Sequence, residues 1–233
     1  MAIAFVAAGS FATNTTVTTQ AIVAPTLQAG DIMLACCYGA STSENIISAP
    51  DGTWAEIQQS WNSGTQQHAI FWKLAAGGDS GASFTFSKAT DNNLTFGGVI
   101  SAWRGCAASP LDATAAGKTE TTTNTDNVSF PAFNPTATTV EVLFVAFYGT
   151  SSTAFSAAMS NDTNPDCTTR FAVQESGLRT ITCTSGLNDG SNIAARTWAS
   201  NSDSDKINTG VVFALVPQSI VPMMMASYRQ RRA

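Results

Sequence analysis

Residues 140–149 read VEVLFVAFYG, and this stretch decides the fold class. In an extended strand successive side chains point to opposite faces. The even-numbered residues from Val140 to Tyr148 would then share one face, and Leu143, Val145 and Phe147 the other. Because both faces are apolar, the stretch is typical of a central strand that is covered on both sides.

Residues 32–39, IMLACCYG, show the same pattern, so Cys36 and Cys37 must point to opposite faces and cannot join one site. Further apolar runs of strand length are separated by Gly, Asn, Asp, Ser and Pro. They lie at 54–61, 68–75, 82–87, 97–105, 170–175, 180–185 and 210–217, with weaker runs at 3–8, 15–20 and 127–130. Helical periodicity does not extend over eleven or more positions anywhere, and only residues 154–160 suggest a helical turn.

These patterns predict an all-β protein, an antiparallel β-sandwich with jelly-roll-like topology. We expect one sandwich domain over residues 1–217 and an extended C-terminal tail over 218–233. The Thr-rich segment 106–138 is interpreted as a long connection with room for one edge strand. The sequence shows no internal repeat strong enough to support a claim.

The composition excludes several classes of protein. Only 12% of the 233 residues are charged, and the net charge of −5 argues against wholesale binding of nucleic acid. No stretch reaches the roughly 20 apolar residues of a membrane-spanning helix. The first residues, MAIAFVAAGSFA, lack the basic start of a signal peptide, so we interpret them as a first strand and expect a protein that does not direct its own secretion.

The chain contains five cysteines, an odd number for a disulfide framework. Free buried thiols are the favoured interpretation, and they indicate assembly in the reducing cytoplasm of a host. One disulfide, between Cys167 and Cys183, is the alternative.

The tetrapeptide GDSG at 78–81 surrounds the nucleophilic serine in trypsin-like proteases, which makes Ser80 a candidate nucleophile. A serine nucleophile needs a histidine base within hydrogen-bond reach. The only histidine, His68, lies twelve residues earlier in the run that leads into this turn. Gly77, Gly78 and the residues after them suit a tight hairpin, so the turn is favoured over a protease, and we expect no enzymatic activity.

Other chemical sites have weaker signals. One histidine and scattered cysteines cannot form a His-rich metal site, and no cofactor is expected. Asp203 and Asp205 could bind calcium, but a turn is favoured. The carboxylates have no context that marks a catalytic acid; the candidates are Asp31, Asp51, Glu56, Asp112, Glu120, Glu141 and Glu175. The five tryptophans suit core packing better than a sugar-binding platform; they are Trp54, Trp61, Trp72, Trp103 and Trp198.

The C-terminal tail, QSIVPMMMASYRQRRA, differs from the rest of the chain. Methionine adapts to irregular partner grooves, and arginine binds carboxylates. We predict that the tail docks on a partner, against the alternative of a frayed terminus. The predicted binding residues are Met223, Met224, Met225, Tyr228, Arg229, Arg231 and Arg232. The predicted structural turn residues are Gly30, Asp31, Gly77, Gly78 and Gly105.

An ordered set of short motifs follows residue 25: Gly30-Asp31, Pro50 to Trp54, Trp72 to Ala75, Phe84 with Phe86, Ala102 to Gly105, and Pro110 to Asp112. This order resembles a β-sandwich module of bacteriophage virion proteins and phage-like bacterial loci. The resemblance covers roughly residues 25–115 well and 116–217 only through the run of strands. It implies a structural or adhesive role and transfers no catalytic residues.

The resulting expectation is a virion structural protein, a capsid decoration or cement protein that acts by protein–protein binding. It would assemble in the host cytoplasm as a homo-oligomer, with a trimer as the first candidate, and contact other virion proteins but no membrane or nucleic acid. The alternative is a tail-fibre or tail-tip adhesin that binds host-surface glycans. A third, weaker option is a polysaccharide hydrolase, which needs two carboxylates about 5 to 9.5 Å apart.

Overall fold

The computed structural model describes residues 2–15, 17–40, 46–62, 66–89, 95–112, 118–123, 127–148, 165–175, 179–199 and 207–219. Regular structure in these residues consists entirely of β-strands, and all of the strand pairings are antiparallel. The predicted all-β antiparallel sandwich is therefore confirmed. The jelly-roll topology specifies in addition how the strands are connected, and it stays a prediction.

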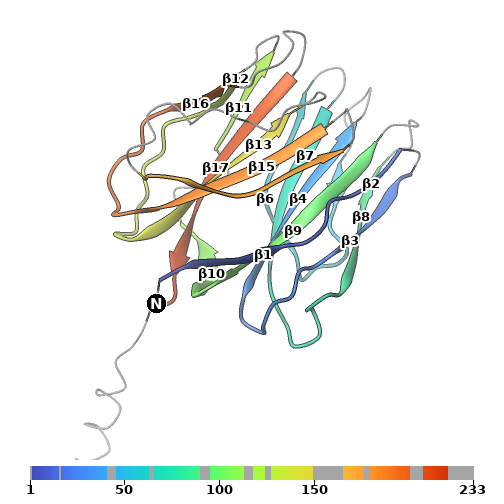
Figure 1. Ribbon diagram of the computed structural model, residues 1–233, viewed down its shortest axis with the longest axis horizontal. Coiled ribbons are helices and arrows are strands. Elements are labelled where there is room, and N and C mark those ends of the chain that lie inside the picture. Colours follow the sequence, from blue (N-terminus) through green and yellow to red (C-terminus); the bar gives the residue numbers. More distant parts are fainter. Residues whose placement is uncertain are drawn as a thin grey trace, which may run out of the picture.

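The strands form two inner and two outer sheets (Figure 1). The first inner sheet has the order β1-β9-β4-β7-β6, with β2 also on β9: β1 (Ala4–Ala8), β2 (Ala12–Asn14), β4 (Ile32–Ala40), β6 (Ala55–Asn62), β7 (Gln66–Leu74) and β9 (Phe96–Arg104). The first outer sheet has the order β3-β8-β5: β3 (Thr19–Val23), β8 (Ser83–Lys88) and β5 (Ile47–Ser48).

The second inner sheet has the order β10-β17-β13-β15-β14, with β11 also on β17: β10 (Cys106–Leu111), β11 (Lys118–Thr123), β13 (Val140–Tyr148), β14 (Thr168–Glu175), β15 (Arg179–Asn188) and β17 (Ile207–Pro217). The second outer sheet pairs β12 (Asn127–Phe130) with β16 (Arg196–Ala199).

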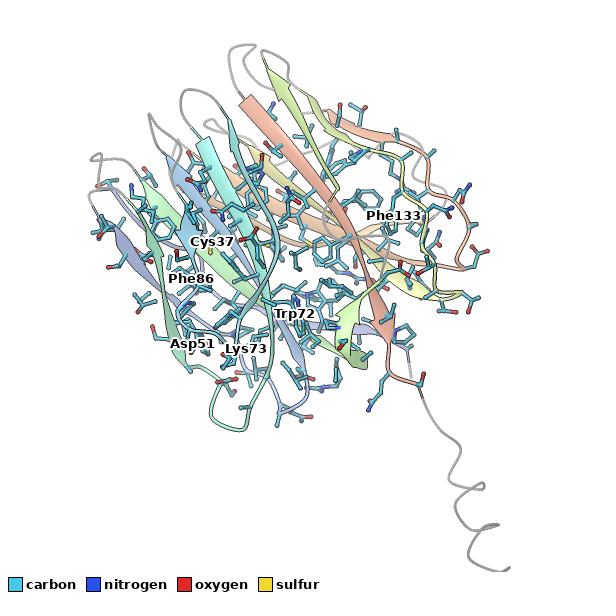
Figure 2. All side chains as sticks on the ribbon, turned by 180° about the vertical axis from the view of Figure 1, so that it is seen from behind. Cys37, Asp51, Trp72, Lys73, Phe86 and Phe133 are labelled. Atoms are coloured by element: carbon cyan, nitrogen blue, oxygen red, sulfur yellow. The ribbon has the colours of Figure 1, made fainter. Side chains whose placement is uncertain are left out.

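Three apolar layers hold the four sheets together. Cys37 and Phe86 lie between the first inner and outer sheets, and Phe133 lies in the corresponding layer of the second half (Figure 2). The middle layer, to which Trp72 contributes, lies between the two inner sheets and contains residues from both halves of the chain. The two halves therefore share a continuous core.

The two-faced strands lie where their sequences predict. In β13, Leu143, Val145 and Phe147 face the middle layer, whereas Val142 and Phe144 face the second outer sheet. In β4, Cys36 faces the middle layer and Cys37 faces the first outer sheet.

All five thiols are free. Cys183 belongs to the middle layer, whereas Cys167 packs against the layer on the opposite face of the same sheet. The alternative of a disulfide between these two residues is therefore wrong, because a sheet separates them.

The second half of the chain repeats the first. Strands β10, β11, β12, β13, β14, β15, β16 and β17 follow one another with the same pairings as β1, β2, β3, β4, β6, β7, β8 and β9; only β5 has no counterpart in the described residues. The sequence shows no repeat strong enough to support a claim, and the repeat is found in the strand order. Equivalent strands keep their pairing and polarity, but they share few identical residues and are joined by connections of different length.

Local irregularities recur at equivalent positions and support this assignment. The pairing of β6 with β7 has a bulge at Ile57, and the pairing of β14 with β15 has one at Arg170. Gly98 in β9 and Gly210 in β17 are equivalent too. A methyl group on Gly98 would meet Ile22 of the outer sheet, and one on Gly210 would meet Phe130 at the equivalent place.

The predicted connection over 106–138 contains three strands, β10, β11 and β12, and so exceeds the single edge strand expected there. Strand β11, with the sequence KTETTT, has no apolar residue, which hid it from a search for apolar alternation. It forms through six paired positions with β17.

His68 is a polar group in the middle layer. Its ring stacks on Phe147 of the other inner sheet, with ring centres 4.6 Å apart, and is almost fully buried. Its Nε2 has no hydrogen-bond partner among the described residues. Burial lowers the pKa of His68 from 6.5 to about 3, because the cation would lose its hydration. The imidazole is therefore neutral in the folded protein at ordinary pH.

We expect Gly98→Ala and Gly210→Ala each to destabilise the fold by about 1–3 kcal/mol, because the added methyl group overpacks a filled layer. Urea unfolding of the purified protein measures this effect. Gly52→Ala is the matched control, since a methyl group there meets no atom within 4 Å. Equal stability of all three variants would contradict the packing argument.

We expect the pH dependence of stability to carry the signature of His68. Its folded pKa, about 3, lies below its ordinary value of 6.5, so the unfolded chain binds the proton first as the pH falls. Stability should decline below pH 6.5 by up to about 1.4 kcal/mol per pH unit and keep declining towards pH 3. The His68→Phe variant lacks this contribution, so its unfolding free energy between pH 6.5 and 4.5 should have a shallower slope than that of the wild type.

Candidate functional site

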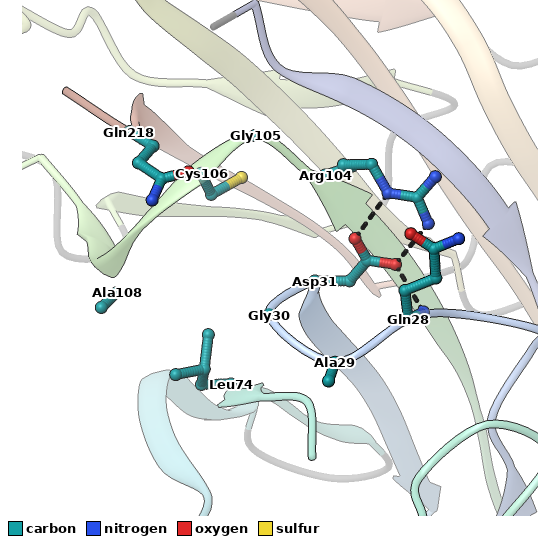
Figure 3. Close-up of a pocket in the computed structure, with 10 residues that line it drawn as sticks. All are labelled: Gln28, Ala29, Gly30, Asp31, Leu74, Arg104, Gly105, Cys106, Ala108 and Gln218. Atoms are coloured by element: carbon teal, nitrogen blue, oxygen red, sulfur yellow. Dashed lines mark hydrogen bonds and ion pairs between the residues drawn. The ribbon is translucent and has the colours of Figure 1, made fainter. Parts of the chain in front are cut away.

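A pocket of about 440 Å³ opens at the end of the molecule where the first half passes into the second (Figure 3). Its walls come from the connection before β4, the end of β7, the turn between β9 and β10, and the end of β17. We call this part of the surface the junction end.

An ion pair with a buried carboxylate and a half-exposed cation forms one wall of the pocket. Arg104 donates two parallel hydrogen bonds to Asp31, from Nε to Oδ1 and from Nη2 to Oδ2, each 2.8 Å long. The backbone N–H of Gln28 donates to the same carboxylate. The Asp31 side chain is 3% exposed, whereas that of Arg104 is 41% exposed. The pair is therefore anchored in the protein through Asp31 and presents one edge of a guanidinium to solvent.

The charges of this pair support each other. Burial raises the pKa of Asp31, but the hydrogen bonds from Arg104 and Gln28 and the charge of Arg104 outweigh it, so the pKa is lowered overall. The hydrogen bond to Asp31 is the largest cause that raises the pKa of Arg104. Both groups are therefore charged at neutral pH.

Glycines at two predicted turn positions shape this site. Gly30 and Gly105 have φ angles of 90° and 81°, in the left-handed region that favours glycine. The carbonyl of Gly105 accepts a hydrogen bond from the N–H of Gln218, so the C-terminal end of the described chain is held beside the pocket. Gly77 and Gly78 do not line the pocket; they lie in the connection between β7 and β8.

A second recess, of about 70 Å³, lies at the same end of the molecule and is lined by Ala2, Ile3, Thr139, Val140, Leu187 and Pro217. It is the counterpart of the pocket in the repeat, because Leu187 of β15 pairs with Glu141 at the start of β13 as Leu74 of β7 pairs with Ile32 at the start of β4. Continuing the pairing of the central strands by one residue places Val140 and Val216 where the first half has Asp31 and Arg104. The second recess is therefore the apolar version of the first.

Sequence reasoning identified part of this site. Asp31 and Arg104 occur in two of the ordered motifs, but their contact across 73 positions had no signal in the sequence. Leu74 and Leu187 were not singled out; they are 42% and 60% exposed, and single leucines at strand ends carry no pattern. The predicted tail residues, Met223 to Met225, Tyr228, Arg229, Arg231 and Arg232, lie outside the described residues.

Ser80 lies in a connection between two sheets. Its Oγ accepts a hydrogen bond from the N–H of Leu27, and Asp79 binds Lys73 at 3.1 Å. The predicted hairpin is wrong in one respect: β7 and β8 do not pair, because β8 joins the outer sheet. His68 lies six residues before the end of β7, roughly 20 Å along the strand from this connection.

Two of the other candidate carboxylates, Asp112 and Glu141, have structural partners. Asp112 accepts hydrogen bonds from the N–H groups of Thr136 and Ala137, and Glu141 binds Ser185 and Arg170. Among the described residues, His, Cys, Asp and Glu form no group of three that could hold a metal ion. Asp203 and Asp205 lie outside them. Core packing is confirmed for the buried tryptophans, which are Trp54, Trp103 and Trp198.

Comparisons with protein-family models, with curated proteins and with solved structures find no match to this chain. In the described part of the chain, no helix is long and apolar enough to cross a membrane. What the structure defines is an antiparallel β-sandwich protein made of two equivalent halves, with a polar and an apolar recess at one end.

The two members of the ion pair should respond unequally to substitution. Arg104→Gln leaves a largely buried carboxylate without its cation, whereas Asp31→Asn leaves a half-exposed cation that water can solvate, so Arg104→Gln should lower the free energy of unfolding by more than Asp31→Asn. Urea unfolding at pH 7 measures both. Because the pKa of Asp31 is lowered on folding, the contribution of the pair is present above its ordinary pKa of 3.8 and is lost as the pH falls further. Equal losses at pH 7 would contradict this view of the pair.

Proposed function

We propose that this chain is a bacteriophage virion structural protein that acts by protein–protein binding, as a capsid decoration protein. The observation that carries the proposal is the concentration of binding features at the junction end. An open pocket with an accessible arginine edge, two exposed leucines at equivalent positions, and the start of the predicted docking tail lie together there.

The exposed apolar side chains support a protein partner. Among the described residues, four large apolar side chains are exposed: Val23, Ile46, Leu74 and Leu187. Two of the four lie at the junction end, and apolar groups beside an arginine are typical of protein interfaces. The exposed edge of Arg104 suits a carboxylate on the partner.

The order of the sequence motifs supports the assignment to virions. The Gly-Asp and Arg-Gly motifs supply Asp31 and Arg104, and hence the wall of the pocket. In the Pro-x-Gly-x-Trp motif, Asp51 accepts a hydrogen bond from the N–H of Thr53, and Trp54 packs edge-on against Phe86. All of these contacts are structural, which suits a particle component. Five free thiols suit assembly in a reducing host cytoplasm.

The adhesin alternative would be favoured by an exposed aromatic side chain beside polar loops. In the described residues, the exposed large apolar side chains are aliphatic. Binding to glycans is one of the outcomes that the test distinguishes.

A particle-binding assay tests the proposal. Capsids that lack the protein are mixed with the full-length chain, or with a chain that ends at Pro217. We expect the full-length chain to saturate the particles at a symmetric copy number and the shorter chain to bind at least tenfold more weakly, because the shorter chain lacks the methionines and arginines of the tail. The oligomeric state in solution, expected to be a trimer, is measured alongside.

Failure of both chains to bind capsids, together with binding of both to host cells or glycans, would replace the proposal with the adhesin. Equal binding of both chains to capsids would preserve decoration but remove the role of the tail.

A further inference from the structure

The second recess at the junction end leaves apolar surface in water. Leu187 is 60% exposed, and the space beside it measures about 70 Å³. This is about half of the roughly 150 Å³ cavity that accepts a benzene molecule in an engineered protein, so it suits one aliphatic side chain. The recess is thus large enough for an anchor residue and too small for an extended ligand.

The chemistry of the recess selects an apolar occupant. Its counterpart in the first half has the Asp31–Arg104 ion pair, but Val140 and Val216 occupy the equivalent positions here. Ala2, Ile3, Thr139 and Pro217 also line the recess, and Thr139 is the only polar residue among its walls. No charged side chain lines this recess, so a ligand gains nothing there from a charge and gains free energy only by burying apolar surface.

The route of the chain identifies the occupant. Pro217 is the last residue of β17 and itself lines the recess, while its neighbour Gln218 lines the polar pocket. Met223 follows only six residues after Pro217, a span of at most about 20 Å. A segment tethered so close to a site has an effective concentration in the millimolar range, which a second molecule rarely reaches in solution.

Methionine suits such a site. Its unbranched thioether side chain has three rotatable bonds and fills irregular apolar spaces. The triplet Met223 to Met225 offers three successive side chains, so that one of them can enter the recess from several backbone paths.

We propose that a methionine of the chain's own triplet Met223–Met225 docks in the apolar recess beside Leu187 and anchors the tail to the junction end. The arginines at 229, 231 and 232 then follow the anchor and stay available for carboxylates on a neighbouring virion protein. This division of the tail rests on the proposed function, because only that function supplies the neighbour.

A set of full-length variants tests the anchor. The tail change replaces all three methionines with serine, and Leu187→Ser alters the recess. Leu74→Ser is the matched control, because it alters the equivalent exposed leucine at the end of β7. We expect the tail change to lower the urea midpoint of the wild type and of Leu74→Ser by the same amount, and to leave that of Leu187→Ser unchanged. The shifts should not depend on protein concentration.

Oxidation of the methionines by dilute peroxide gives a second measurement that needs only the wild type. Mass spectrometry should find at least one of the three oxidised severalfold more slowly in the folded protein than in urea. Equal effects of the tail change in both leucine variants, or equal oxidation rates, would overturn the proposal. The tail change and the Leu187→Ser change are coupled when the first has an effect only in the absence of the second. A coupling that grows with protein concentration would overturn the proposal in favour of the tail of a second copy.

Neither measurement uses capsids, so the proposed docking of the methionine and the proposed function are tested by different experiments. Either proposal can be refuted while the other stands. If the tail change and Leu187→Ser are coupled as expected but the chain does not bind capsids, the decoration function is refuted and the docking of the methionine stands. Capsid binding without coupling would refute the anchor and preserve decoration.

Discussion

The contact between the two inner sheets is the constraint on which the rest of the structure depends. Each inner sheet is covered by an outer sheet on one face and by the other inner sheet on the second face. The central strands β4 and β13 must therefore be apolar on both faces, and polar groups in the shared layer must be neutral or paired. His68, uncharged and stacked on Phe147, meets this requirement.

The halves contact each other through equivalent faces. Leu34, Cys36 and Tyr38 of β4 face the middle layer, and their counterparts in β13, Leu143, Val145 and Phe147, face it from the other side. Contact through the same face of two equivalent units is the arrangement of a twofold-symmetric dimer, here within one chain. The edge contacts agree, because β1 lies against β14 and β11 lies against β6. A face that would need a partner in a single unit is thus covered within the molecule.

The two halves differ in the positions of their paired charged side chains. The first half has Asp31 and Arg104 where the second has two valines. In the second half, Glu141 binds Arg170 and Ser185, where the first half has Ile32, Ile57 and Trp72 in the middle layer. Exchange of a complete buried ion pair for apolar residues of similar volume is often close to neutral in stability, whereas loss of one member is costly. In each case one half has the complete pair and the other half has apolar residues, so neither half leaves one member of the pair alone.

The sequence predicts what depends on local alternation and misses what depends on pairing. The faces of β4 and β13, including the opposite directions of Cys36 and Cys37, follow from the period of two and from apolar composition alone. Turn residues around Gly77 predict a turn, but the sheet that the next strand joins depends on packing that the turn does not encode. Strand β11 has no apolar alternation and exists through its pairing with β17. The repeat is hidden for the same reason, since equivalence lies in strand order, bulges and register.

The position of both recesses at one end follows from this symmetry. Gln218 lines the first and Pro217 lines the second, so the pseudo-twofold axis runs along the strands and leaves the molecule where the tail begins. A partner that approaches along this axis meets Leu74 with a guanidinium beside it, whereas the equivalent recess at Leu187 has no guanidinium and is the one that the tail is proposed to fill. The backbone at this end is nearly symmetric, but the side chains at equivalent positions differ in charge. A binding surface of this kind can fix the orientation of the chain on its partner, because rotation by half a turn would place a partner carboxylate against valines instead of Arg104.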